Sequence, residues 1–147
     1  MKISTYNPSQ SPDVINLFTK VFSDSEGQDE GEVIGRLVSD LIITTNESDI
    51  VGFVAILKEE IVGCIFFSRL TLPSDKIAFI LSPVAIATER QGKGIGQQLI
   101  KYGIEYLRLK KIDLVFTYGD PGFYSKVGFQ QISEEIVKAP FKLTQPE

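Results

Sequence analysis

Histidine is the residue type whose absence constrains this sequence of 147 residues most strongly. Without histidine the chain lacks the usual general base, the commonest metal ligand and the base of Ser-His and Cys-His nucleophile pairs. Any catalysis must therefore use carboxylates, tyrosine, lysine, a thiol, backbone amides or a bound cofactor. We expect no metal site.

Cysteine occurs once, as Cys64, which excludes an internal disulfide framework and is consistent with a reducing cytoplasm. Residues 1–30 do not show the basic start, apolar run and small-residue cleavage site of a secretory signal. The longest apolar stretch, residues 77–87, is interrupted by Ser82 and Pro83 and is too short to span a bilayer. We therefore expect a cytoplasmic protein with no membrane partner.

Positive charge is also in deficit, because 15 Lys and Arg residues against 19 Asp and Glu residues give a net charge of −4. This balance argues against nucleic acid as the main partner, since duplex binding needs a basic face. Acidic residues gather in residues 24–32, and basic residues prevail in residues 89–111. Two interpretations stay open: solvated helix faces, or a basic wall for a polyanionic cofactor and an acidic surface for a cationic substrate.

What is present is typical of a globular protein, with 43% hydrophobic and 23% charged residues. No repeat or linker divides the chain, so we expect a single domain over residues 1–147. Apolar periodicity and continuous apolar runs predict, in order, a strand at 2–6, helices at 11–22 and 29–42, strands at 50–57, 61–67 and 77–87, a helix at 94–109 and a strand at 113–118. A turn at 119–122 leads into a short helix. This order predicts an α/β sandwich around a mixed sheet.

Three local features of these elements are specific enough to test. Ser11 is the expected N-cap of the first helix, with Pro12 at the first helical position. The second helix is expected to place a set of apolar residues on one side, namely Val33, Ile34, Leu37, Val38 and Leu41. Residues 58–60 are expected to join two strands as a hairpin.

The most informative motif is the glycine-rich turn at residues 91–96, which reads Gln-Gly-Lys-Gly-Ile-Gly between a predicted strand and a predicted helix. Such a turn directs unpaired backbone N–H groups at one point, with the positive end of the helix dipole behind them. A diphosphate fits that arrangement. The dinucleotide fingerprint fails because its third glycine position is Gln97, and the nucleoside-triphosphate loop has no match. The alternative is a turn that only packs a helix closely on a sheet.

Pro83 is the second feature, because it lies inside an apolar strand, where it cannot donate a ladder hydrogen bond. We expect a bulge or a splayed edge at this point. Splayed strands leave N–H and C=O groups free to pair with an amide-containing ligand arm such as pantetheine. An ordinary edge-strand proline is the alternative.

Together these residues resemble the GNAT N-acetyltransferase superfamily. Residues 91–96 resemble its Q/R-x-x-G-x-G/A acetyl-CoA signature, residues 83–86 resemble the preceding strand, and residues 124–129 resemble its downstream Y-x-x-x-G-F motif. The resemblance implies a central, mostly antiparallel sheet flanked by helices and splayed at the cofactor site. Thr88 departs from it, since relatives often carry proline there. Residues 119–121, together with residues 21–22 and 26–27, further resemble a bacterial subgroup of predicted small acetyltransferases.

The resemblance also implies a function for particular residues. Acetyl-CoA is the implied cosubstrate, and the acceptor is a primary amine of a small molecule or peptide. The implied proton donor to the departing thiolate is Tyr124. The remaining implied cofactor contacts are the pyrophosphate-binding amides of Gln91, Gly92, Lys93, Gly94, Ile95 and Gly96, and the pantetheine-pairing residues Val84, Ala85 and Ile86.

The general base is not implied by the resemblance. Asp120 and Glu26 are candidates, Glu26 also as a ligand of a cationic acceptor, and a water chain is equally open. Arg90 and Lys93 are unassigned candidates for the remaining phosphates. A non-catalytic acyl-CoA-binding sensor remains the alternative function, since it would share every cofactor residue. The oligomeric state, a homodimer included, is open.

Overall fold

A central β-sheet organises the protein, for which a computed structural model describes residues 1–73, 75–118, 130–131 and 136–138. Within these residues the sheet has seven strands in the order β1-β2-β3-β4-β5-β7-β6. Their bounds are β1 Lys2–Thr5, β2 Ile50–Leu57, β3 Glu60–Leu70, β4 Ala78–Ile86, β5 Leu114–Tyr118, β6 Gln130–Gln131 and β7 Ile136–Lys138. Neighbouring strands are antiparallel except β4 and β5, which are parallel. The predicted mixed, mostly antiparallel sheet is confirmed.

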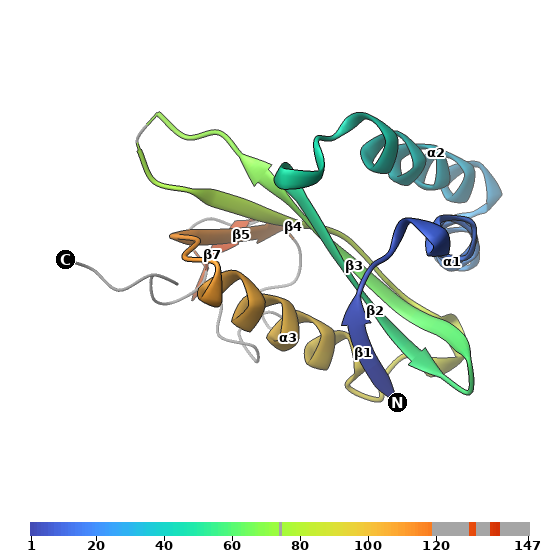
Figure 1. The fold of residues 1–147 in the computed structure, drawn as a ribbon. Helices are drawn as coiled ribbons and strands as arrows, with labels where there is room; N and C mark the ends of the chain where they lie inside the picture. The colour runs from blue at the N-terminus through green and yellow to red at the C-terminus, as the bar shows by residue number, and fades with distance from the viewer. Residues whose placement is uncertain (74, 119–129, 132–135, 139–147) are drawn as a thin grey trace.

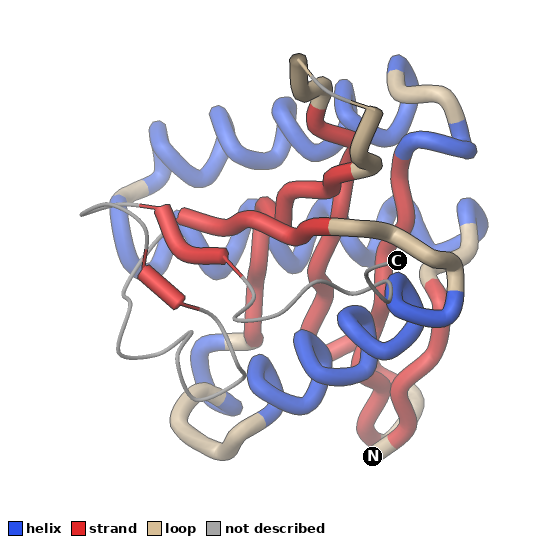
Figure 2. Tube along the Cα trace, turned by 90° about the vertical axis from the view of Figure 1, so that its left-hand side faces the viewer, coloured by secondary structure: helices blue, strands red, loops and turns tan. Residues whose placement is uncertain are grey.

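Helices cover both faces of this sheet (Figures 1 and 2). Helices α1 (Ser11–Glu26) and α2 (Gln28–Thr44) lie on one face, and α3 (Ile95–Leu109) lies on the other. Two apolar clusters fill the layers: Phe53, Phe67 and Leu99 belong to the one under α3, and Phe18, Val38 and Phe66 to the one under α1 and α2. The predicted α/β sandwich is confirmed.

The hairpin between β2 and β3 turns more tightly than expected. Lys58 and Glu59 both have positive φ, 51° and 67°, and Leu57 pairs with Glu60. Two consecutive residues with positive φ are typical of a type I′ turn, whose twist matches that of the strands. Glu60 is therefore the first residue of β3 and not part of the turn.

The prediction for the start of α1 was wrong at the N-cap. Gln10 holds that position, and Ser11 is the first helical residue. The Ser11 hydroxyl donates a hydrogen bond back to the Pro8 carbonyl at 2.8 Å and also contacts the Tyr6 hydroxyl, so it is not available to cap the helix. The helix also runs to Glu26, because it is Gly27, with φ of 100°, that ends it.

The apolar side of α2 is only partly buried. Val38 is buried, but Val33 and Leu37 are 45% and 51% exposed. Gly31 and Gly35 explain the difference, because both are buried and face Thr19 and Ser23 of α1. The two helices approach through these glycines, which turns Val33 and Leu37 toward solvent.

Replacing Gly31 by valine is expected to lower the free energy of unfolding by about 3 kcal/mol, because the new side chain is forced into a closely packed contact. A Cβ at Gly31 would collide with Ser23 Oγ and lie 2.5 Å from the Thr19 carbonyl oxygen. Urea denaturation measures the change. Arg36→Val, which places the same side chain at an exposed position of the same helix, is the control. Equal losses in the two variants would contradict the close helix contact.

Candidate functional site

The glycine-rich turn connects β4 to α3, as predicted. A short 3-10 helix, Thr88–Arg90, follows β4, and Gly94 is the N-cap of α3 with φ of 82°. Gly92 also has positive φ, 78°. Both glycines therefore adopt a backbone conformation that side chains disfavour, and a Cβ at either position would meet nothing within 4 Å. The turn is open on the side to which these absent side chains would point.

Beyond Gln91, the backbone amides of this turn donate no hydrogen bond to the described part of the chain. The first hydrogen bond of α3 runs from the Gln98 N–H to the Gly94 carbonyl, at 3.0 Å. Among the described residues, none accepts a hydrogen bond from the amides of residues 92–97. No side chain caps α3 at Gly94. The open end of α3 therefore offers several donors and the positive end of its dipole to an anion.

A pocket of about 530 Å³ lies against these amides. Among the described residues, its lining contains Arg90 and no carboxylate, so the charge of this lining favours an anionic ligand. Lys93 is exposed in the same turn. The described residues that line it are Ile86, Arg90, Gln91, Gly92, Gly94, Ile95, Gly96 and Gln97. The structure thus brings together the turn residues that the sequence singled out.

Two hydrogen bonds hold the segment that leads from β4 into the turn. The Ala87 N–H donates to the Val62 carbonyl of β3 at 2.8 Å. The Gln91 side chain donates through Nε2 to the Ile86 carbonyl at 3.0 Å. The Gln91 side chain therefore ties the first residue of the turn to the end of β4, a contact that the sequence analysis did not foresee.

Strand β4 is irregular at Pro83, as expected. Ile65 of β3 pairs with Val84 and Phe67 pairs with Leu81, so Ser82 and Pro83 together oppose Phe66 in a β-bulge. The Ser82–Pro83 peptide bond is cis.

Beyond the bulge, strands β4 and β5 separate. Their pairing ends at Leu81 and Thr117, although β4 continues to Ile86. Val84, Ala85 and Ile86 pair with β3 on one side, and among the described residues no strand pairs with them on the other. This is the predicted splay.

Thr117 holds the two strands together where they begin to part. It is fully buried, and its hydroxyl donates to the Leu81 carbonyl at 3.0 Å. The sequence analysis missed this residue. The available signal was a hydroxyl residue among the apolar residues of a buried strand, Leu114–Tyr118.

The acidic segment at residues 24–32 forms the corner between α1 and α2. Its charged side chains, Glu26 included, are exposed. Asp24 accepts a hydrogen bond from the Thr88 hydroxyl at 2.7 Å, which joins this corner to the turn after β4. The corner therefore lies beside the glycine-rich turn, although the two are far apart in the sequence.

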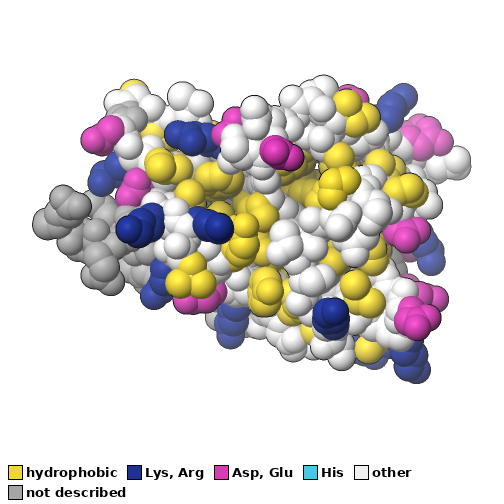
Figure 3. All heavy atoms as spheres, viewed as in Figure 1, with side chains coloured by type: hydrophobic (Ala, Val, Ile, Leu, Met, Phe, Trp, Pro, Cys, Tyr) yellow, Lys and Arg dark blue, Asp and Glu magenta, His cyan; other side chains and the backbone are white. Residues whose placement is uncertain are grey.

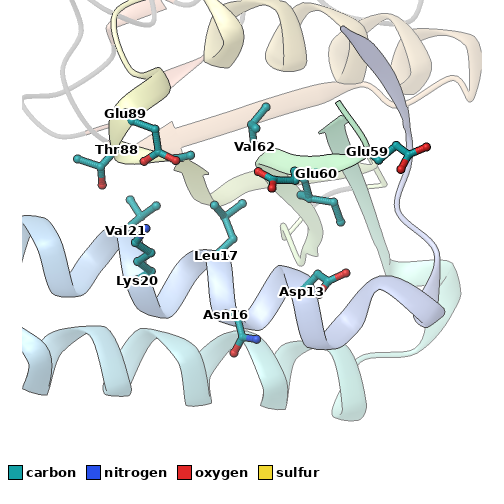
Figure 4. Close-up of a pocket in the computed structure, with 12 residues that line it drawn as sticks. Asp13, Asn16, Leu17, Lys20, Val21, Glu59, Glu60, Val62, Thr88 and Glu89 are labelled. Atoms are coloured by element: carbon teal, nitrogen blue, oxygen red, sulfur yellow. The ribbon is translucent and has the colours of Figure 1, made fainter. Parts of the chain in front are cut away.

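A pocket of about 320 Å³ lies between α1, the β2–β3 hairpin and the 3-10 helix that precedes the turn (Figure 4). Val21 points from α1 toward Thr88, and Leu17 points into the space between Glu89 and Glu60. The lining carries more acid than base, with Asp13, Glu59, Glu60 and Glu89 against Lys20. Its charge opposes that of the pocket at the amides of residues 92–97.

A third hollow, of about 330 Å³, lies away from the turn and is largely apolar. Tyr6, Ile42, Ile50, Val51 and Tyr106 contribute to its lining. Figure 3 shows hydrophobic side chains gathered on this face, over the middle strands between α2 and α3. The hollow shares no residue with the turn.

Cys64 is a core residue, as expected. It is fully buried, and burial raises the pKa of its thiol. A buried thiol with a raised pKa is a poor nucleophile, because the thiolate is the reactive form. Cys64 is therefore unsuited to carry an acyl group.

The two predicted catalytic residues, Tyr124 and Asp120, lie outside the described residues. In the part of the chain that is described, no group of His, Cys, Asp and Glu residues is arranged to hold a metal ion. None of the helices in that same part combines the length and the hydrophobicity that a bilayer-spanning segment requires.

Comparison with known proteins shows which family the sequence matches. Residues 41–131 match the sequence model of the GNAT acetyltransferase domain. YjhQ of Escherichia coli, named as an uncharacterized N-acetyltransferase, is 31% identical over 125 residues, which are 83% of this chain and 65% of YjhQ. The chain thus spans about two thirds of the length of this relative.

Two crystal structures resemble the fold closely. YhbS of Escherichia coli, solved with CoA, gives a TM-score of 0.79 at 24% identity over 97% of this chain and 81% of that one. A GNAT family acetyltransferase from Brucella melitensis, solved with acetyl-CoA, gives a TM-score of 0.74 at 26% identity over 93% of this chain and 85% of that one.

Proposed function

This chain belongs to the GNAT acetyltransferase family, and from that membership we propose that it transfers the acetyl group of acetyl-CoA to a primary amine of a small molecule or peptide. The proposal includes a reducing cytoplasmic setting, which the single unpaired thiol of Cys64 supports.

The observation that carries the proposal is the set of unused amides at the open end of α3. A pyrophosphate has several acceptor oxygens and a double negative charge, which match the donors of residues 92–97 and the helix dipole. Arg90 supplies a guanidinium in the same lining. The acetyl-CoA in the Brucella melitensis relative supports this choice of ligand.

The free edge of β4 is the proposed site of the pantetheine arm. Pantetheine carries amides, which can pair with the backbone groups of Val84, Ala85 and Ile86 as a strand would. We propose that a main-chain N–H in this segment also donates to the thioester carbonyl. A preorganised donor to the developing oxyanion contributes about 3 kcal/mol to such reactions.

The chemistry needs one proton removed and one supplied. A primary amine with a pKa of about 10.4 is mostly protonated at neutral pH, so it must lose a proton before it attacks. The departing thiolate, with a pKa of about 8.5, gains from a phenol donor. We propose Tyr124 for that donor, supported by the motif at residues 124–129. We propose Asp120 as the general base.

The acceptor is proposed to be cationic. The exposed acidic corner between α1 and α2 lies beside the turn, and Glu26 is its proposed contact with the amine. Opposite charge raises the local concentration of such an acceptor and speeds its encounter.

The experiment that tests the proposal measures thiol release from acetyl-CoA across a library of amines, with an amine-free reaction as the control. Amine-dependent release, and stabilisation by acetyl-CoA and CoA but not by NADH, are expected. Stabilisation by acetyl-CoA with no release for any amine would instead favour the non-catalytic sensor. Absence of both would contradict the proposal.

A further inference from the structure

One hydrogen bond joins the acidic corner to the glycine-rich turn. The Thr88 hydroxyl donates to Asp24 Oδ2 at 2.7 Å, across 64 positions of the sequence. Asp24 lies in the last turns of α1, and Thr88 is the first residue of the 3-10 helix that leads into the turn. Both residues are exposed, so the contact lies outside the apolar core.

Helix α1 is a rigid support for Asp24. Val14, Phe18 and Val21 are buried in the cluster that also contains Ala85 of β4. Val21 lies one helical turn before Asp24, so the backbone of α1 is fixed by packing close to the carboxylate. Asp24 therefore holds a defined position relative to β4.

The segment that leads from β4 into the turn is tied at both ends. The Ala87 amide ties its start to β3, and the Gln91 side chain ties its end back to Ile86. Between these points, two hydrogen bonds form the 3-10 helix. The Arg90 N–H donates to the Ala87 carbonyl at 2.8 Å, and the Gln91 N–H donates to the Thr88 carbonyl at a longer distance of 3.4 Å. Thr88 is the point at which this segment reaches α1.

We propose that Asp24 is a positioning residue for the phosphate-binding amides, which acts through its hydrogen bond with Thr88. The inference rests on the proposed function, because it assumes that CoA binds at residues 91–96. Amide donors must be held to within fractions of an ångström to bind phosphate oxygens well. The hydrogen bond to α1 fixes the segment that leads into these donors. It also joins the glycine-rich turn to the acidic corner, where we propose that the acceptor binds.

The test compares CoA binding by isothermal titration calorimetry in wild-type protein and in Thr88→Val, which keeps the shape of the side chain but removes the hydroxyl. The Kd for CoA is expected to rise about three- to tenfold, the effect of losing one hydrogen bond. Thr88→Ser, which restores a hydroxyl, and Asp24→Asn, which keeps an acceptor oxygen, are expected to bind within about twofold of wild type. Ser25→Ala is the control at the end of α1.

Two further readouts separate positioning from a general loss of structure. The ligand-free melting temperature of Thr88→Val is expected to stay within about 2 °C of wild type, since the bond is exposed. In an Asp24→Ala background, Thr88→Val should weaken CoA binding no further, because the bond is already gone. If wild type binds CoA and Thr88→Val binds equally well, or if the two substitutions add, this inference is wrong while the proposed function stands. If wild type does not bind CoA, both fail.

Discussion

Replacing Gly94 by valine is expected to abolish CoA binding while the protein stays folded. A Cβ at this position points into open space at the mouth of α3, where we propose that the pyrophosphate lies. A β-branched side chain there would block the amides of residues 92–97 and would disfavour the positive φ of Gly94. We expect affinity for CoA to fall by more than about 100-fold, because the valine side chain would block most of the backbone N–H donors proposed to bind the pyrophosphate.

Thermal unfolding with and without CoA measures this loss. At about one hundred times its Kd, CoA adds about 2.7 kcal/mol to wild-type stability, roughly 8 °C for a chain of this size. Gly94→Val should show no shift. Gly27→Ala, which also places a side chain at a positive φ with open space around it, is the control for backbone strain and should keep the shift. If CoA raised the melting temperature of Gly94→Val as much as that of wild type, the glycine-rich turn would not be part of the CoA site.

Replacing Tyr124 by phenylalanine is expected to lower kcat about 100-fold with little change in the affinity for acetyl-CoA. The phenol is proposed to donate a proton to the departing thiolate, an interaction made as the bond breaks, so its loss affects turnover and not binding. Thiol release under saturating acetyl-CoA measures kcat, and calorimetry measures the Kd.

Tyr102→Phe is the matched control, because Tyr102 lies on α3 with its ring against Phe53 and 44% of its surface exposed. It should retain wild-type turnover. An unchanged kcat in Tyr124→Phe would remove the proposed role of this tyrosine. A loss of acetyl-CoA affinity equal to the loss of kcat would make it a binding residue instead.

The sequence predicted the glycine-rich turn well because its signals are local. A continuous apolar run places β4 before it and a helical apolar period places α3 after it, and glycine is the residue type that tolerates the positive φ found at Gly92 and Gly94. Pro83 predicted the bulge for the same reason, since the missing N–H is a property of the residue itself.

The contacts that shape the site across the fold could not be predicted in this way. The bonds from Thr88 to Asp24 and from Thr117 to Leu81 join residues that the sequence does not place together. The exposure of Val33 and Leu37 depends on how closely α1 approaches Gly31 and Gly35, which apolar periodicity does not encode. Strands β6 and β7, of two and three residues, are too short to show a period.

A titration of CoA into ¹⁵N-labelled protein, followed by the amide resonances, tests the central claim most directly. The account predicts that the amides of Gly92, Gly94 and Gly96 shift to saturation with a single binding constant, with smaller shifts in Val84 and Ile86. No shift at the three glycines on addition of saturating CoA, or shifts confined to the pocket around Asp13 and Glu60, would contradict it.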